Sequence, residues 1–93
     1  MEKLKREDIK TLSAQLQDGW EVAEERILRR EFKFSDFLGA LAFVNKLGGM
    51  AEEMRHHPDL HLSYGQVTVE FTTHEAGGLT EKDFEAASRI DML

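Results

Sequence analysis

The chain has 93 residues, a formal net charge of −6 at pH 7 and no cysteine. The acidic balance argues against non-specific binding to nucleic acid or anionic membranes, and the lack of cysteine excludes disulfides, thiolate nucleophiles and cysteine-ligated metals. A charged first segment and the absence of a long apolar run predict a single cytoplasmic domain over residues 1–93, small enough that oligomerisation is expected.

The first third of the chain predicts one helix and two strands. Apolar residues recur at helical spacing between residues 9 and 16 and predict a helix that ends near Gln17. From residue 20 the hydrophobic period becomes two, which predicts strands over residues 20–22 and 28–34.

A second, longer helix is predicted to follow. Ser35-Asp36 offers an N-cap, and a broad apolar stripe then runs from Phe37 to Met54. Gly48-Gly49 weakens the pattern, because each glycine inside a helix costs about 1 kcal/mol relative to alanine. The apolar spacing continues beyond this pair, so the helix is expected to persist until Pro58 stops it.

Residues 60–71 predict a β-hairpin. Their apolar residues alternate, and Gly65-Gln66 is predicted as a two-residue loop whose first glycine suits a type II′ turn. This register pairs Tyr64 with Val67, where Tyr64 is expected to pack, and it places every apolar side chain on one face.

The same register, extended beyond the strands, predicts which histidines meet. It places His57 opposite His74, and directly opposed residues have Cβ atoms only about 4.5–5.5 Å apart. It also places His61 opposite Glu70, as an ordinary exposed pair, so His61 is left out of the candidate site.

The segment from Thr80 to Asp83 fits a capping box that opens a third helix. The predicted fold class is therefore α+β. It is a four-stranded antiparallel sheet with helices packed on one face, in the order helix, two strands, helix, two strands, helix.

The histidines suggest proton transfer. Imidazole gives or accepts a proton near neutral pH, and a positioned acid or base contributes roughly 10²- to 10⁴-fold to a rate. Glu52 precedes His56 by one helical turn and is predicted to orient that ring. Asp83 is predicted to orient His74 in the same way.

This constellation resembles the pterin-4a-carbinolamine dehydratase family. The family signature is an acidic residue, three positions, His-His-Pro, an aromatic residue, a further histidine and an aspartate. The matching residues here are Glu52, His56, His57, Pro58, Tyr64, His74 and Asp83, and similar positions extend over nearly the whole chain.

The resemblance implies a hydro-lyase that dehydrates 4a-hydroxytetrahydropterin to quinonoid dihydropterin, in tetrahydropterin recycling, with no metal or organic cofactor. His56 and His74 would transfer protons, Glu52 and Asp83 would support them, and His57 and Pro58 would contact the pterin. The resemblance also implies a homodimer that continues the sheet, or a homotetramer built on the long helices. It further implies a functional link to an aromatic amino acid hydroxylase.

Three other interpretations remain open. The histidine pair is consistent with a solvated helix terminus, and Asp83 with a capping residue alone. His57 and His61 have the spacing of a metal-binding helix, although Pro58 between them breaks such a helix. The third alternative is a protein-interaction module, because relatives in animals act as dimerisation cofactors of a homeodomain transcription factor.

Overall fold

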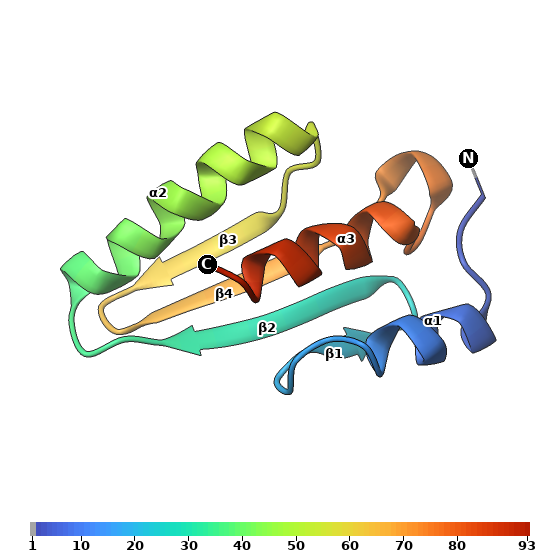
Figure 1. Cartoon of the computed structure of the whole chain (residues 1–93), viewed down its shortest axis with the longest axis horizontal. Coiled ribbons are helices and arrows are strands. Elements are labelled where there is room, and N and C mark those ends of the chain that lie inside the picture. Colours follow the sequence, from blue (N-terminus) through green and yellow to red (C-terminus); the bar gives the residue numbers. More distant parts are fainter. Residues whose placement is uncertain (1) are drawn as a thin grey trace.

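The computed structural model describes residues 2–93. Three helices and four strands follow one another in the predicted order (Figure 1). The elements are α1 (Arg6–Ser13), β1 (Glu21–Ala23), β2 (Ile27–Lys33), α2 (Phe37–Met54), β3 (Asp59–Ser63), β4 (Gln66–Phe71), a short 3₁₀ helix (His74–Ala76) and α3 (Glu81–Ile90).

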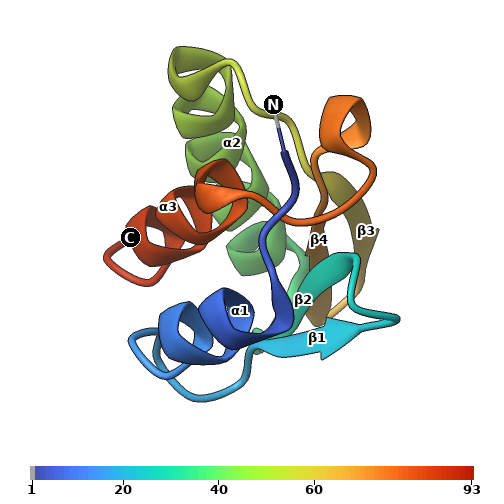
Figure 2. The same cartoon turned by 90° about the vertical axis from the view of Figure 1, so that its right-hand side faces the viewer.

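The strands form one antiparallel sheet in the spatial order β1, β2, β4, β3. All three helices lie on the same side of this sheet, as the end-on view shows (Figure 2). The predicted fold class is confirmed. Within residues 2–93, no helix combines the length and hydrophobicity needed to cross a bilayer.

The core lies between the sheet and the helices. Alternate residues of β4 point into it, because successive side chains of a strand face opposite sides of the sheet. Those side chains pack with Leu28 of β2 and with buried residues of α2 and α3. The buried apolar side chains are Leu28, Ala40, Leu47, Ala51, Val67, Val69, Phe71, Leu79, Phe84, Ala86, Ala87 and Ile90.

The predicted start of α2 is confirmed, and its glycines do not interrupt it. The Asp36 carboxylate accepts a hydrogen bond from the backbone N–H of Gly39 at 2.8 Å, as an N-cap does. A Cβ atom added at Gly48 or Gly49 would meet nothing within 4 Å, so both glycines lie on the open side of the helix. Helix α1 is shorter than predicted and ends at Ser13.

The predicted hairpin exists, but its register is wrong by two residues. Leu62 lies opposite Val67 and Leu60 opposite Val69, so the loop residues are Tyr64 and Gly65. Neither loop residue has a positive φ angle, and the type II′ prediction therefore fails.

The reason for glycine at position 65 is close approach. A Cβ atom there would lie 2.9 Å from the carbonyl oxygen of Phe34, and the Gly65 carbonyl accepts a hydrogen bond from the Phe34 N–H at 2.8 Å. The end of β2 thus packs against the hairpin loop and sets its position.

The register change moves the pairs that depended on it. His61 lies opposite Thr68, and Glu70 lies opposite Asp59. Tyr64 is 70% exposed in the loop, so the expectation that it packs is wrong. The apolar face survives, because a shift by an even number of residues leaves every side chain on its original side of the sheet.

Candidate active site

The end of α2 determines where the two adjacent histidines point. Arg55 has φ 55° and ψ 38°, the left-handed conformation that often terminates a helix. The backbone N–H of His56 still reaches the carbonyl of Ala51, at 3.1 Å. The chain turns here, and as a result His56 is buried (9% exposed) while the side chain of His57 is 64% exposed.

His56 forms a buried pair with Asp83. Its Nε2 atom lies 2.5 Å from Oδ1 of Asp83, a carboxylate with no exposed surface at the start of α3. The imidazole ring also stacks on Phe71, with 5.7 Å between ring centroids and 8° between planes. Contacts on its edge and its face therefore fix the orientation of His56.

The second oxygen of Asp83 is held from the other side. Oδ2 accepts hydrogen bonds from the Thr73 hydroxyl at 2.8 Å and from the Thr80 backbone N–H at 2.9 Å. The Thr80 contact is the predicted capping box, so that part of the prediction is confirmed. The two threonine hydroxyl oxygens lie 2.8 Å apart.

These contacts determine where the protons lie. Thr73 uses its only hydroxyl hydrogen toward Asp83, so the Thr80 hydroxyl donates to Thr73. Oδ2 of Asp83 accepts two hydrogen bonds, and a carboxylate that also accepts at Oδ1 needs a donor on His56. The proton between His56 and Asp83 therefore belongs to Nε2 of His56, which leaves Nδ1 as the basic nitrogen of the neutral ring.

His57 has a different partner. Its Nε2 atom lies 2.7 Å from Oε1 of Glu52, and both side chains are mostly exposed. An exposed ion pair contributes at most about 1 kcal/mol, so this contact orients His57 only weakly.

The predicted partners of the histidines are therefore wrong. Asp83 contacts His56 rather than His74, and Glu52 contacts His57 rather than His56. Glu52 and His56 are spaced by one helical turn in the sequence, but they do not share a helix face because the helix ends before His56.

His74 reaches the site from a separate turn. It opens the 3₁₀ helix that follows β4, and this turn is closed by a bridge between Thr73 and Gly78. The Gly77 residue after it has φ 72°, a conformation that glycine adopts without strain. His74 is exposed, and no hydrogen bond holds its ring within residues 2–93.

One hollow of about 190 Å³ brings the three histidines together. It is lined by His56, His57 and His74, with Arg55 and Lys82 adding positive charge and Thr72 and Glu75 completing the wall. We call it the three-histidine hollow. The predicted opposition of His57 and His74 by strand register is wrong, since β3 begins only at Asp59 and is shifted relative to β4.

The other predicted site residues do not line this hollow. Glu52 and Asp83 contact histidines of the hollow without lining it, and Pro58 also lies outside its lining. Across residues 2–93, no three histidine, cysteine or acidic side chains gather as metal ligands would.

Thr73 is a site residue that the sequence analysis missed. It is 1% exposed, and it joins the carboxylate behind His56 to the turn that carries His74. The predicted capping box contained only Thr80 and Asp83. No residue spacing in the sequence indicated that Thr73 would also bond to Asp83. Its position directly before His74 was the available signal.

A family model described as pterin 4 alpha carbinolamine dehydratase matches residues 2–93. A relative from Rubrobacter xylanophilus is 47% identical over 90 residues, which cover 97% of this chain and 83% of that protein. A relative from Thermosynechococcus vestitus is 47% identical over 92 residues, covering 99% and 95% of the two chains. The names of both relatives place them in the same family.

Solved structures agree with this fold. A crystal structure described as a transcriptional coactivator/pterin dehydratase from Brucella melitensis has a TM-score of 0.90 and 32% identity, and covers 97% of this chain and 96% of that one. A pterin dehydratase-like RuBisCO assembly factor of the α-carboxysome has a TM-score of 0.69 at 20% identity, over 82% of this chain and 89% of that one. The second likeness concerns the fold alone.

The family model and the relatives cover nearly the whole chain, and the solved fold matches the one described above. This chain belongs to the pterin 4 alpha carbinolamine dehydratase family.

Proposed function

We propose that this protein dehydrates 4a-hydroxytetrahydropterin to quinonoid dihydropterin by histidine acid–base catalysis. The observation that carries the proposal is the buried His56–Asp83 pair at the wall of a hollow that two further imidazoles also line. Tetrahydropterin recycling beside an aromatic amino acid hydroxylase is the setting in which this substrate arises.

The reaction needs one acid and one base. An acid protonates the hydroxyl on C4a, and the C4a–O bond breaks as water leaves. The lone pair of N5 forms the new N5–C4a double bond, and a base removes the proton from N5. Atoms and charge balance without a metal or an organic cofactor.

His56 is suited to be the base. Its Nε2–H donates to Asp83, so Nδ1 is free to accept the proton from N5, and the carboxylate stabilises the imidazolium that results. His74 is suited to be the acid. It lines the same hollow from a separate turn, and its ring contacts no carboxylate within residues 2–93. His57, oriented by Glu52, would position the pterin.

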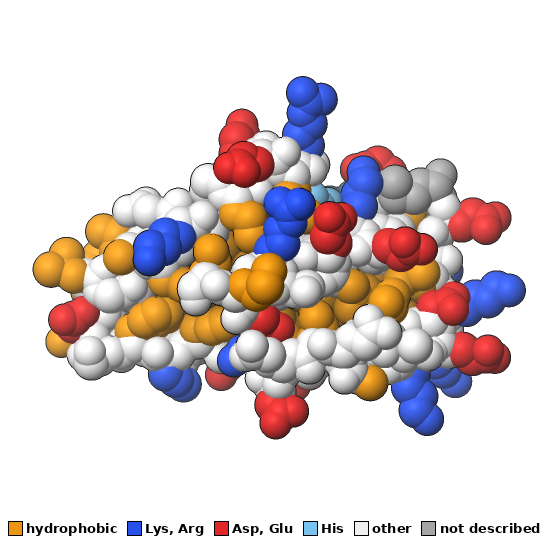
Figure 3. Space-filling model, viewed as in Figure 1, with side chains coloured by type: hydrophobic (Ala, Val, Ile, Leu, Met, Phe, Trp, Pro, Cys, Tyr) orange, Lys and Arg blue, Asp and Glu red, His pale blue; other side chains and the backbone are white. Residues whose placement is uncertain are grey.

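The exposed start of α2 bears on association and on a second function. Phe37 is 42% exposed and Leu38 is 74% exposed, and apolar side chains gather at this end of the molecule (Figure 3). Strand β3 also leaves one edge of the sheet unpaired in the described chain. We include in the proposal a homo-oligomer that covers these surfaces.

The second candidate function is protein–protein interaction through the same surfaces. The Brucella melitensis neighbour is described as a coactivator as well as a dehydratase, which favours testing it. An interaction module does not need proton transfer by His56, so the effect of His56 substitution on turnover separates the two functions.

For the dehydratase, His56→Ala is expected to lower the rate of quinonoid dihydropterin formation above background by roughly 10²- to 10⁴-fold, because the base is lost. His61→Ala is the matched control, since His61 lies on the exposed face of β3 opposite Thr68. Its rate should equal that of the wild type. Equal rates for wild type and His56→Ala, with circular dichroism showing both folded, would refute the assigned role.

Asp83→Asn tests the proton assignment. The two donors on Oδ2 should hold the amide oxygen, which turns the NH₂ group toward Nε2 of His56 and forces the proton to Nδ1. We expect kcat to fall by about 10²-fold or more with KM little changed, because the ring stays in place in the wrong tautomer. Glu52→Gln, the same change at the exposed pair, should have a small effect. A matching small effect for both variants would contradict the assignment.

The oligomer is tested by the mass in solution. Light scattering should give two or four times the mass of one chain, and Leu38→Glu should lower a tetramer to a smaller species if the helices pack together. A monomer for the wild type at micromolar concentration would remove association from the proposal.

A further inference from the structure

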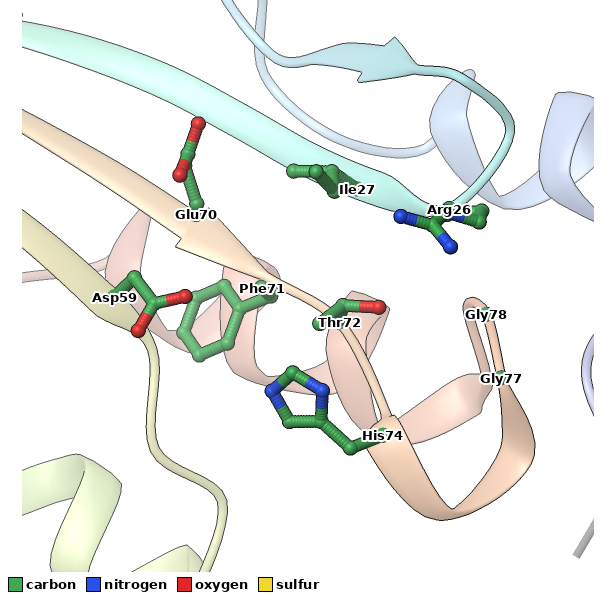
Figure 4. A pocket seen from close by; sticks show the side chains of 9 residues that line it. All are labelled: Arg26, Ile27, Asp59, Glu70, Phe71, Thr72, His74, Gly77 and Gly78. Atoms are coloured by element: carbon green, nitrogen blue, oxygen red, sulfur yellow. The ribbon is translucent and has the colours of Figure 1, made fainter.

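A second hollow lies directly beside the three-histidine hollow. Its volume is about 290 Å³, and its lining residues are drawn in Figure 4. The two hollows share Thr72 and His74. We call it the Asp59 hollow. The ring of His74 therefore stands at a boundary, where one molecule can lie partly in each hollow.

The Asp59 hollow opens on the face of the sheet that the helices do not cover. Asp59 lies opposite Glu70 in the β3–β4 register, and Arg29 lies opposite Glu70 in the β2–β4 register, so these side chains share that face. Ile27, two residues before Arg29, is on the same side and gives the hollow an apolar wall.

The two carboxylates differ in what they contact. Arg29 Nε donates to Glu70 at 2.5 Å, and this hydrogen bond, together with the charge of Glu70, raises the pKa of Arg29. The Asp59 carboxylate makes no hydrogen bond or ion pair with any residue from 2 to 93. A carboxylate beside a second carboxylate, with its acceptors unused, is suited to a ligand that brings N–H donors.

We propose that Asp59 binds the aminopyrimidinone edge of the pterin and is thus a specificity-determining residue. This inference rests on the proposed function. The edge presents N3–H and the 2-amino group side by side, a donor pair that matches the two oxygens of a carboxylate as a guanidinium does. Ile27 supplies apolar surface for the flat ring.

A pterin bound at Asp59 would place its reacting atoms near the histidines. The N3–H edge lies across the pyrimidine ring from C4a, so a pterin anchored at Asp59 extends toward His74 and presents C4a and N5 to the three-histidine hollow. Arg26 lines the Asp59 hollow as well, so the lining is not purely acidic and a simple cation gains less from it than a neutral donor edge does.

The test compares two ligands and two variants. Binding of dihydropterin and of the corresponding dihydrolumazine, in which oxygen replaces the 2-amino group, is measured by calorimetry with wild type and Asp59→Asn. Wild type should prefer dihydropterin by roughly tenfold or more, since a charge-assisted hydrogen-bond pair is lost with the amino group. Asp59→Asn should lose most of this preference.

Glu31→Gln is the matched control, because Glu31 is an exposed carboxylate on the same face outside the hollow, opposite Thr68. It should behave as the wild type. A preference that persists unchanged in Asp59→Asn overturns the inference and leaves the proposed function intact. A wild type that binds no dihydropterin overturns the proposed function, and the inference with it.

Discussion

The contact between His56 and Asp83 is the interaction on which the site depends. A carboxylate with no exposed surface is costly to bury unless hydrogen bonds replace its water, and here Thr73, Thr80 and His56 supply those bonds. Each donor comes from a different segment: the residues after α2, the end of β4 and the start of α3. The pair therefore orients a ring and also joins these segments.

The same contact distinguishes His56 from the other two histidines. They line one hollow, but only His56 has a buried anion behind it. His57 has an exposed partner, and His74 has none among the residues described. The three imidazoles thus differ in their surroundings, which fits the proposal that a single residue type serves both halves of a dehydration.

The family signature and the hydrophobic pattern predicted much of this from the sequence. The order of elements, the N-cap at Asp36 and the capping box at Thr80 follow from local residue preferences, and the structure has all three. The hairpin register did not follow, because an even shift leaves the apolar face unchanged and the pattern cannot detect it. Gly65 suggested a turn type, whereas its real constraint is the backbone of Phe34, which is distant in sequence.

The predicted partners of the histidines were wrong for a related reason. Helical spacing relates Glu52 to His56 only while the helix continues, and the left-handed conformation of Arg55 ends it one residue too early. No local pattern marks an arginine for that conformation, which glycine or asparagine usually adopts. Thr73 was missed because its contact with Asp83 arises where a strand end meets a helix start, and that is a tertiary feature.

The measurement that tests the account most directly is the tautomer of His56 by ¹⁵N NMR of the imidazole rings, assigned by comparison with His56→Gln. The account predicts that neutral His56 carries its proton on Nε2, with Nδ1 unprotonated, while the exposed His61 shows the mixture of an ordinary solvated ring. A proton on Nδ1 of His56, with Nε2 bare toward Asp83, would contradict it.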